Sequence, residues 1–450
     1  VRPPTNGGAD ESGRWNRECI QCHATRGQPG FLPNGQVETR VAEFGIACEA
    51  CHGPGEEHVD AHRNPGKRLL ARLSKDADPS IVNPGRLDHE HASEVCGQCH
   101  GVAAYATNGS ERDFLVTGFT FKPGDDLDDS RMLLGPDLPD EVRDDLMASN
   151  KAMFDGTLYS DGAVRVGGRE LNGVTQSPCW TAGTMADGSE RPAFSCLSCH
   201  RLHQDPRDPR KVEAWTDDLL DEDTRGDRAC LDCHPEVREE VAEHTRHEPG
   251  TPGSACYDCH MPYTVYGLLK GIRDHRITSP SVANTVETGR PNACNVCHLD
   301  RSLGWTADQL TEWTGADRPA LTPDQETVPA AALAALTGDA GDRALAAWTL
   351  GWSLARPASG HEWLPPVVAP LLEDPYDAVR VIAGRTLATL PGYEDLEYDP
   401  VASPEERAAV AAEVLARHQR AATDAPSPLD PARIPELLTQ RDDARVQLLE

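Results

Sequence analysis

The C-terminal quarter of the chain repeats apolar and polar positions with the spacing of amphipathic helices. From about Val328 onward, alanine and leucine recur at three- and four-residue intervals, and short breaks rich in Pro, Gly and Asp interrupt them. This periodicity predicts helices because residues three and four apart share one helical face. The predicted helices are Pro329–Leu336, Asp342–Leu354, Leu364–Leu372, Asp377–Leu390 and Pro404–Arg420.

One of these segments indicates how the helices are arranged. Asp374-Pro-Tyr-Asp-Ala-Val-Arg-Val-Ile-Ala-Gly-Arg-Thr-Leu resembles the second helix of a HEAT repeat, with its Asp-Pro start and its Val-Arg step. Two or three such helix pairs form a short α-solenoid. A plain helical bundle is the alternative, and the solenoid is favoured chiefly on this one segment.

The preceding 300 residues are polar, rich in turns and poor in such periodicity. Within residues 119–178, Ala163-Val-Arg-Val alternates in the manner of a β-hairpin strand, and Phe121-Lys-Pro-Gly-Asp-Asp is typical of a turn. Hydrophobic residues make up 38% of the chain and aromatic residues only 5%. An ordinary apolar core is therefore difficult to build here.

A short motif, Cys-x-x-Cys-His, occurs seven times in this polar part of the chain. The seven copies are Cys19-Ile-Gln-Cys22-His23, Cys48-Glu-Ala-Cys51-His52, Cys96-Gly-Gln-Cys99-His100, Cys196-Leu-Ser-Cys199-His200, Cys230-Leu-Asp-Cys233-His234, Cys256-Tyr-Asp-Cys259-His260 and Cys294-Asn-Val-Cys297-His298. Each copy is typical of a c-type haem attachment site, where both thiols bond to one porphyrin and the histidine becomes an axial ligand of the iron.

Two other interpretations of paired cysteines explain the motif less well. A structural zinc site takes four ligands from two such pairs, but it gives no reason for a histidine after every second cysteine. A disulfide within Cys-x-x-Cys would close a very short loop. The sequence therefore predicts seven covalently attached haems c. Of the 15 cysteines the motifs use 14, and Cys179 is expected to be a buried structural thiol.

These observations predict a mainly α fold with extensive loops. A multihaem cytochrome c domain stapled by its haems precedes a short HEAT-like α-solenoid, and porphyrin supplies much of the apolar surface buried in the first part. The expected divisions are 1–118 for an N-terminal three-haem segment, 119–178 for a haem-free insertion packing on the haem domain, 179–300 for a four-haem segment, 301–327 for a linker and 328–450 for the helical repeat domain.

The net charge of −30 narrows the classes of partner. Nucleic acid is excluded as a partner because its binding needs a basic surface, and attraction to an anionic membrane surface is disfavoured. No apolar run approaches the roughly 18 residues that span a bilayer, so no membrane span is expected. Because haem c is attached outside the cytoplasmic membrane, a periplasmic or extracellular location is expected, with a signal peptide removed before Val1.

Several stretches around and between the motifs resemble one family. These stretches are Trp15-Asn-Arg-Glu-Cys-Ile-Gln-Cys-His, Cys48-Glu-Ala-Cys-His-Gly-Pro-Gly-Glu-Glu-His, Lys122-Pro-Gly-Asp-Asp-Leu, Gln176-Ser-Pro-Cys-Trp, His244-Thr-Arg-His, Arg273-Asp-His-Arg-Ile and Pro291-Asn-Ala-Cys-Asn-Val-Cys-His. Together they resemble the bacterial multihaem cytochromes c with a C-terminal HEAT or tetratricopeptide-type domain. That family is related to the group of cytochrome c-554, pentahaem nitrite reductase and hydroxylamine oxidoreductase, and it usually carries a further motif upstream.

The ten histidines outside the motifs decide whether each iron has a free coordination position, because a second axial histidine fills the last position of the iron. The resemblance implies that His58 and His203 are distal ligands. His244 and His247, three apart, share a helical face and are expected to cap two adjacent haems. His275 is a further distal candidate. One of His62, His89 and His91 is a weaker candidate, whereas His361 and His418 are expected at the surface.

The leading functional hypothesis is electron transfer through closely packed, mostly bis-histidine haems. The expected partners are other redox proteins or further copies of the chain, in a homo-oligomer or a filament, with the solenoid as docking surface. One alternative is a multihaem oxidoreductase acting on small nitrogen or sulfur species at an open haem, although no motif has the Cys-x-x-Cys-Lys form of the nitrite reductase group. Another alternative is a subunit of a polymeric cytochrome wire or redox complex.

Overall fold

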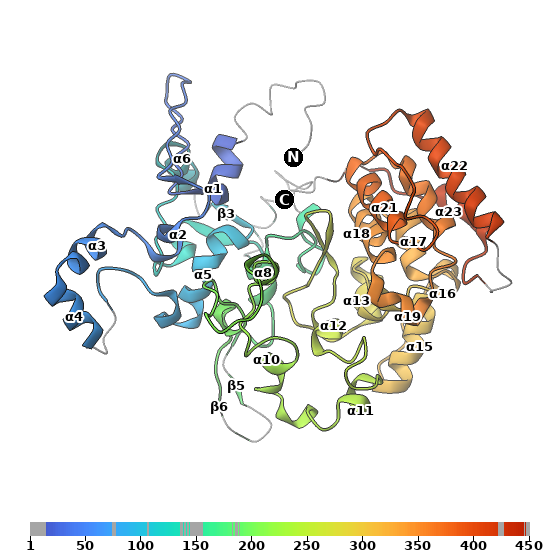
Figure 1. Cartoon of the computed structure of the whole chain (residues 1–450), viewed down its shortest axis with the longest axis horizontal. Coiled ribbons are helices and arrows are strands. Elements are labelled where there is room, and N and C mark those ends of the chain that lie inside the picture. Colours follow the sequence, from blue (N-terminus) through green and yellow to red (C-terminus); the bar gives the residue numbers. More distant parts are fainter. Residues whose placement is uncertain are drawn as a thin grey trace. The chain divides into compact units, whose positions relative to one another are not determined.

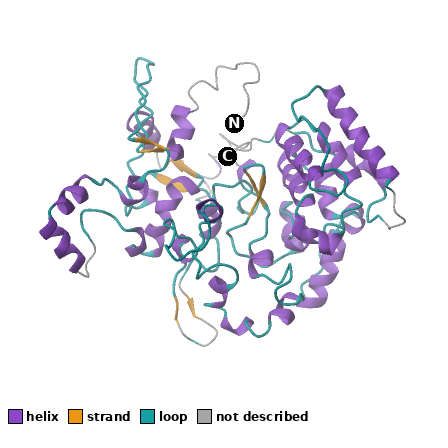
Figure 2. Cartoon of the chain, in the orientation of Figure 1, coloured by secondary structure: helices purple, strands orange, loops and turns teal. Residues whose placement is uncertain are grey.

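The computed structural model describes residues 15–73, 78–105, 108–135, 138, 141, 144, 156–181, 183–184, 188, 190–421, 427–444 and 446. Helices dominate, sheets are limited to short two-stranded ladders, and loops are extensive (Figures 1 and 2). The chain forms two compact units. Unit 1 contains Val1–Leu134, Gly168–Thr175 and Cys179–Arg225, and unit 2 contains Gly135–Gly167, Gln176–Pro178 and Gly226–Glu450.

Unit 1 carries the first four Cys-x-x-Cys-His motifs on short helical elements. Its helices are η1 (Trp15–Cys19), α1 (Ile20–His23), α2 (Cys48–His52), α3 (Glu56–Arg63), α4 (Pro65–Leu73), η2 (Pro84–Arg86), α5 (His89–His100), α6 (Asn108–Thr117), η3 (Leu127–Asp129), α8 (Glu170–Val174), η4 (Cys196–Ser198) and α9 (Val212–Trp215). Its antiparallel ladders pair β1 (Ala24–Thr25) with β2 (Glu43–Phe44), β3 (Ala103–Tyr105) with β4 (Arg131–Leu133), and β5 (Gly183–Thr184) with β6 (Glu190–Arg191).

Few apolar side chains pack around helix α5, but those that do lie very close to it. Leu127, Leu171 and Val174 form a small buried cluster there. Gly97 on α5 lies so near α8 that a Cβ atom at this position would stand 2.0 Å from Cδ2 of Leu171. The glycine within the third motif thus allows α8 to approach α5.

Unit 2 carries the last three motifs and a large helical core. Its earlier elements are α10 (Arg228–Leu231), η5 (Pro235–Val237), α11 (Val241–Thr245), α12 (Cys256–His260), β7 (Val265–Gly267), β8 (Lys270–Ile272), α13 (Val282–Thr288) and α14 (Ala293–Cys297). The later helices are α15 (Leu303–Thr314), α16 (Pro323–Thr327), α17 (Ala330–Thr337), α18 (Ala340–Leu350), η6 (Ser353–Ala355), α19 (Arg356–Ser359), α20 (Pro365–Val368), η7 (Ala369–Glu373), α21 (Asp377–Ala388), α22 (Pro404–Arg420), η8 (Pro431–Arg433) and α23 (Ile434–Leu438).

Local signals in the sequence explain where the C-terminal helices begin. Helix α22 spans the predicted range because Ser403 and Glu406 form a capping box ahead of the helical run. Helix α18 begins two residues before the predicted Asp342, since the Asp339 carboxylate accepts hydrogen bonds from the Gly341 and Asp342 amides. Four of the five predicted helices are therefore confirmed, with their ends shifted by up to four residues.

The prediction of one continuous α-helix over Leu364–Leu372 is wrong in detail. The segment forms a four-residue α-helix, α20, followed by the 3-10 helix η7. Pro370 interrupts the regular bonding because proline has no amide hydrogen to donate, whereas Pro366 lies in the first helical turn, where an amide has no partner within the helix.

The C-terminal helices enclose one continuous apolar core. Helix α17 packs on α18, α18 packs on α21, and α20 and η7 pack on α22 (Figure 1). Buried alanine and leucine side chains such as Ala332, Leu336, Ala347, Leu350 and Leu387 fill the space between them. This part of unit 2 has the ordinary core that the sequence of unit 1 lacks.

A buried ion pair lies within this helical core. The guanidinium of Arg343 on α18 donates to both carboxylate oxygens of Asp374, from Nε to Oδ2 at 2.6 Å and from Nη2 to Oδ1 at 3.1 Å, and both side chains are 0% exposed. Arg343 Nη1 also donates to the carbonyls of Gly338 and Asp442. Asp374, from the Asp-Pro start of the HEAT-like segment, therefore connects two helical segments.

Two smaller expectations concern residues 156–181. The predicted hairpin at Ala163-Val-Arg-Val forms, with an antiparallel bridge between Leu158 and Val164 and a hydrogen bond from the Tyr159 amide to the Ala163 carbonyl. The expectation that Cys179 is buried is wrong, because its side chain is only partly buried in a loop of unit 1. Among the described residues, no helix is both long enough and apolar enough to cross a membrane.

Candidate functional site

Each Cys-x-x-Cys-His motif begins in a turn of helix. The first four copies involve α1, α2, α5 and η4, and the last three involve α10, α12 and α14. The amide of the motif histidine donates to the carbonyl of the first cysteine at 2.9 Å for His200, 2.9 Å for His234 and 2.8 Å for His298. A helical turn puts residues three apart on one side, so both thiols of a motif can face one group.

Three motif histidines face a second histidine from elsewhere in the same unit. The rings of His52 and His203 have centroids 6.1 Å apart with 20° between their planes. In unit 2 the rings of His244 and His260 are 6.1 Å apart at 16°, and those of His247 and His298 are 6.1 Å apart at 35°. Three of the histidines predicted as distal ligands thus lie opposite motif histidines.

The spacing within these pairs is what two trans ligands of one metal ion require. Metal–imidazole bonds of about 2.0 Å place the centroids of two trans imidazoles about 6 Å apart. Side chains in van der Waals contact would stack more closely than this, as the rings of His58 and His62 do at 4.4 Å. The residues present therefore fit a haem iron between each pair.

Hydrogen bonds at Nδ1 set which ring nitrogen is available. His52 Nδ1 lies 2.7 Å from the Val82 carbonyl, His200 Nδ1 3.0 Å from Asp218, His247 Nδ1 2.6 Å from Thr245 and His275 Nδ1 3.0 Å from Arg273, with a backbone oxygen as the partner each time. A carbonyl oxygen can only accept, so Nδ1 carries the proton and Nε2 keeps its lone pair. This is the arrangement of a histidine that binds a metal through Nε2.

Two motif histidines have carboxylates in place of carbonyls at Nδ1. His100 Nδ1 lies 2.7 Å from Oε2 of Glu170, and His234 Nδ1 lies 3.2 Å from Oε1 of Glu236. The hydrogen bond that His100 donates to the Glu170 carboxylate raises the pKa of His100 against the opposing effect of burial. Sequence reasoning missed Glu170, because nothing in its local sequence relates it to a histidine 70 residues earlier.

Within each unit, cysteines of different motifs touch. The Cys22 thiol donates to the backbone carbonyl of Cys99 at 3.8 Å, and a further interaction with the Cys99 side chain lowers the pKa of Cys22 to about 6 against the effect of burial. The thiols of Cys96 and Cys196 interact in the same way, as do those of Cys230 and Cys256. Porphyrins bonded to these thiols would therefore be close neighbours.

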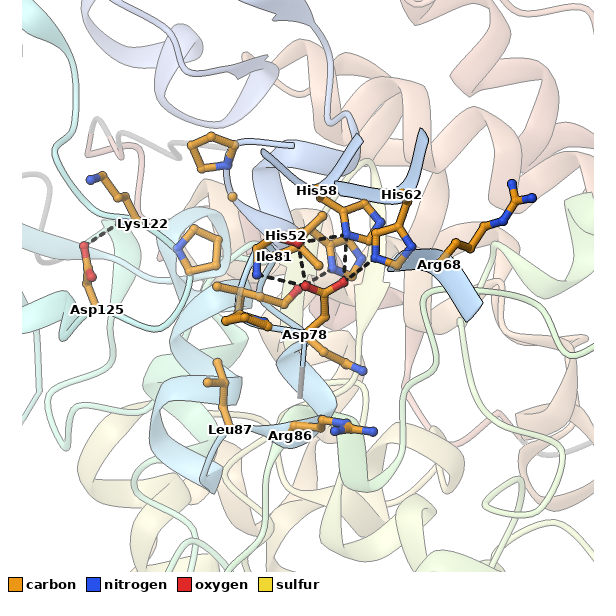
Figure 3. Close-up of a pocket in the computed structure, with 17 residues that line it drawn as sticks. His52, His58, His62, Arg68, Asp78, Ile81, Arg86, Leu87, Lys122 and Asp125 are labelled. Atoms are coloured by element: carbon orange, nitrogen blue, oxygen red, sulfur yellow. Dashed lines mark hydrogen bonds and ion pairs between the residues drawn. The ribbon is translucent and has the colours of Figure 1, made fainter. Parts of the chain in front are cut away.

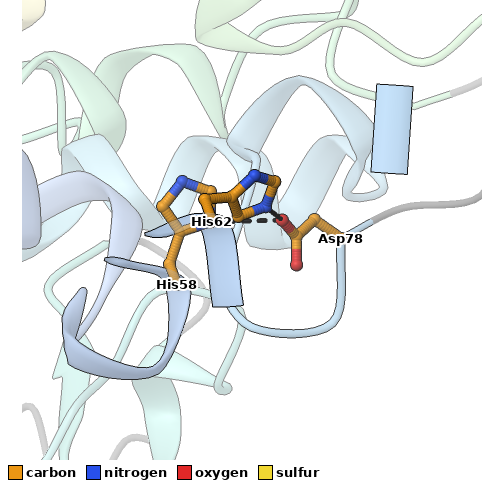
Figure 4. Close-up of side chains that lie close together, drawn as sticks. All are labelled: His58, His62 and Asp78. Carbon is orange, nitrogen blue, oxygen red and sulfur yellow. Dashed lines mark hydrogen bonds and ion pairs between the residues drawn. The ribbon is translucent and has the colours of Figure 1, made fainter. Parts of the chain in front are cut away.

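The structure gives the remaining predicted ligands different surroundings. His58 lies against His62 and Asp78 on the wall of a cavity of about 870 Å³ that His52 also lines (Figures 3 and 4). His89 packs against Trp180, and His91 Nδ1 contacts Asp88. Among the described residues, no second imidazole stacks opposite His23, His100 or His234.

Comparisons with known proteins match part of the chain. Residues 234–317, which include the sixth and seventh motifs, match the model of the cytochrome c552 family. A segment of 86 residues is 28% identical to cytochrome c-554 of Nitrosomonas europaea and covers 19% of this chain and 35% of that relative. The chain thus spans about a third of the length of the relative it matches. No solved structure matches the chain. Together with the histidine pairs, these similarities support a relationship of the chain to the multihaem c-type cytochromes.

Proposed function

We propose that the chain is a heptahaem c-type cytochrome that carries electrons through closely packed, mostly bis-histidine haems in the periplasm or outside the cell. The observation that carries the proposal is the trio of histidine pairs, His52 with His203, His244 with His260 and His247 with His298, each 6.1 Å between ring centroids. An iron held by two imidazoles has no free position for a substrate, so its chemistry is one-electron transfer.

The chain contributes to this function by orienting the histidines that would hold each haem and by placing charged groups beside them. Seven haems c bonded through Cys19, Cys22 and the other twelve motif cysteines would supply the redox chemistry. The backbone carbonyls at Nδ1 orient each imidazole and fix its tautomer, and the carboxylates of Glu170 and Glu236 increase the electron density on theirs. The contacts between cysteines of different motifs support short electron-transfer distances between neighbouring haems.

We also propose that the helices of 328–450 form a HEAT-like docking surface for a redox partner or for another copy of the chain. The support is the continuous apolar core between these helices, which leaves their outer faces for contacts. A filament of copies would appear as mass above one chain in light scattering of the holoprotein, and a single-chain mass at all concentrations would contradict self-assembly.

Coulometry combined with protein-film voltammetry tests the electron-transfer proposal. We expect the holoprotein to take up seven electrons per chain, one for each motif. Adding nitrite, hydroxylamine or sulfite should produce no catalytic current. A catalytic current with any of these would instead favour the second candidate, an oxidoreductase with an open haem, whose first candidates are the haems of His23, His100 and His234.

A further inference from the structure

A buried arginine lies beside the first and third Cys-x-x-Cys-His motifs. Arg131 is the first residue of strand β4, and only 6% of its surface is exposed. Its Nη2 donates to the backbone carbonyl of Gln98 at 2.8 Å, inside the third motif. The next residue is Cys99, whose own carbonyl lies 3.8 Å from Sγ of Cys22 in the first motif. The guanidinium is therefore close to attachment residues of two motifs.

The positive charge of Arg131 has no counter-ion among the described residues. Its guanidinium lies over the ring of Phe119, with Cζ 3.8 Å from the ring centroid. In the part of the chain that the structure describes, its Nε has no hydrogen-bond partner and no carboxylate forms an ion pair with it. Charged side chains are rarely buried without a partner, because removing a charge from water is costly. Stability alone therefore does not explain the position of Arg131.

The charge of Arg131 acts on the cysteines of both motifs. Burial lowers the pKa of Arg131, but a guanidinium stays protonated at neutral pH. The pKa of Cys22 is lowered by the Cys99 side chain and also by the charges of Arg131 and Arg169. The Cys22 side chain and burial raise the pKa of Cys99, and the charge of Arg131 opposes this rise. Arg131 is thus the cation that acts on both thiols.

A fixed positive charge beside a haem favours the reduced form, because reduction adds one negative charge. At a buried position the effect is strong, since salt screens buried charges much less than exposed ones. We propose that Arg131 raises the reduction potentials of two haems at once, those attached at Cys22 and at Cys99, a role that rests on the proposed function because it requires haem at both motifs. At the third motif this charge opposes the Glu170 carboxylate beside His100.

Spectroelectrochemical titration of the holoprotein tests this role. In Arg131→Gln and in Arg131→Met we expect two of the seven midpoint potentials to fall. Each should fall by roughly 60 mV, a tenfold change in the ratio of oxidised to reduced haem for a one-electron couple. Arg40→Gln is the matched control, because Arg40 lies in the same unit with a side chain that is 76% exposed and 3.8 Å from Glu38. It should leave all seven potentials unchanged.

Three outcomes would overturn the proposal. The first is unchanged potentials in an Arg131→Gln protein with all seven haems attached. The second is a fall in Arg131→Met but not in Arg131→Gln, which would assign the effect to the hydrogen bond to Gln98 rather than to the charge. The third is incomplete haem attachment in both neutral variants, which would make Arg131 a structural residue. Absence of haem from the first or third motif of the parent chain would instead contradict the proposed function.

Discussion

Oε2 of Glu170 lies 2.7 Å from Nδ1 of His100, so a carboxylate contacts this motif histidine where backbone carbonyls contact the motif histidines His52 and His200. The amide of Gly168 donates to Oε1 of Glu170 at 3.0 Å and holds the carboxylate toward the ring. A negative charge beside an axial imidazole stabilises the oxidised iron more than the reduced iron. The haem of His100 should therefore have a lowered reduction potential.

Removing the charge of Glu170 tests this relationship. In Glu170→Gln we expect the midpoint potential of one haem to rise by roughly 60 mV, a tenfold change for a one-electron couple. Spectroelectrochemical titration measures it. Glu236→Gln is the matched control, since Glu236 stands 3.2 Å from His234 at a more exposed position, and its shift should be smaller. Equal midpoint potentials in Glu170→Gln and the parent would show that Glu170 does not lower the potential of this haem.

The distal histidines can be tested one at a time. In His203→Ala we expect one low-spin iron to become high-spin, because His203 is the ring opposite His52. In His247→Ala a different iron, that of His298, should change. Magnetic circular dichroism of the oxidised protein distinguishes the two spin states. His361→Ala changes a partly exposed histidine in the C-terminal part and should leave every iron unchanged. A spin change in that variant would show that the method reports general damage.

The buried ion pair in the helical core predicts a large loss of stability. Asp374→Ala leaves the Arg343 guanidinium buried without its bidentate partner, which should cost about 3–5 kcal/mol of unfolding free energy. Denaturant unfolding followed by circular dichroism measures it. The control is Asp443→Ala, because Asp443 faces the same arginine from 3.8 Å at 54% exposure and should contribute at most about 1 kcal/mol. Similar losses in the two variants would contradict the role given to burial.

Close packing at the third motif predicts that Gly97 tolerates no side chain. A Cβ atom there would meet Leu171 at 2.0 Å, so Gly97→Ala should destabilise unit 1 by about 1–3 kcal/mol and lower the yield of holoprotein. Thermal unfolding and the haem content per chain measure both effects. Gly135→Ala has no atom within 4 Å of the added Cβ and serves as the comparison. A normal melting temperature in Gly97→Ala would show that α8 is free to move away.

Without haem, the C-terminal helices should stay folded while the motif helices should not, because only the C-terminal helices bury a large apolar core of side chains. The helices α17, α18, α21 and α22 bury an ordinary apolar core, so their amides should stay protected in hydrogen–deuterium exchange of the apoprotein. The motif helices α1, α2, α10 and α12 should exchange rapidly, because little apolar side-chain surface holds them. Protection that is uniform along the chain would contradict this division.

Much of the helical part could be predicted because its signals are local. Ser403 and Glu406 mark the start of α22, and the motif spacing identifies the cysteines and proximal histidines without any tertiary information. The three histidine pairs depend instead on how distant segments meet. His203 was a predicted ligand, but nothing in the spacing related it to His52, which lies 151 positions earlier in the chain.

The surroundings of His58 could not be predicted either, because they also depend on a contact between segments that are distant in the sequence. Family resemblance implied a distal haem ligand at His58, and that role stays a prediction. The structure adds Asp78, which reaches His58 and His62 only because the chain returns toward α3 after α4. A carboxylate in a loop carries no sequence signal for such a contact, and Glu170 beside His100 was missed for the same reason.

Low-temperature EPR of the oxidised holoprotein, with spins counted against total iron, shows whether paired histidines hold the irons. We expect at least three low-spin irons, from the pairs of His52, His260 and His298, and no change in their signals when nitrite, hydroxylamine or sulfite is added. Fewer than three low-spin irons, or a shift of these signals on adding one of the three compounds, would contradict an electron-transfer chain built on paired histidines.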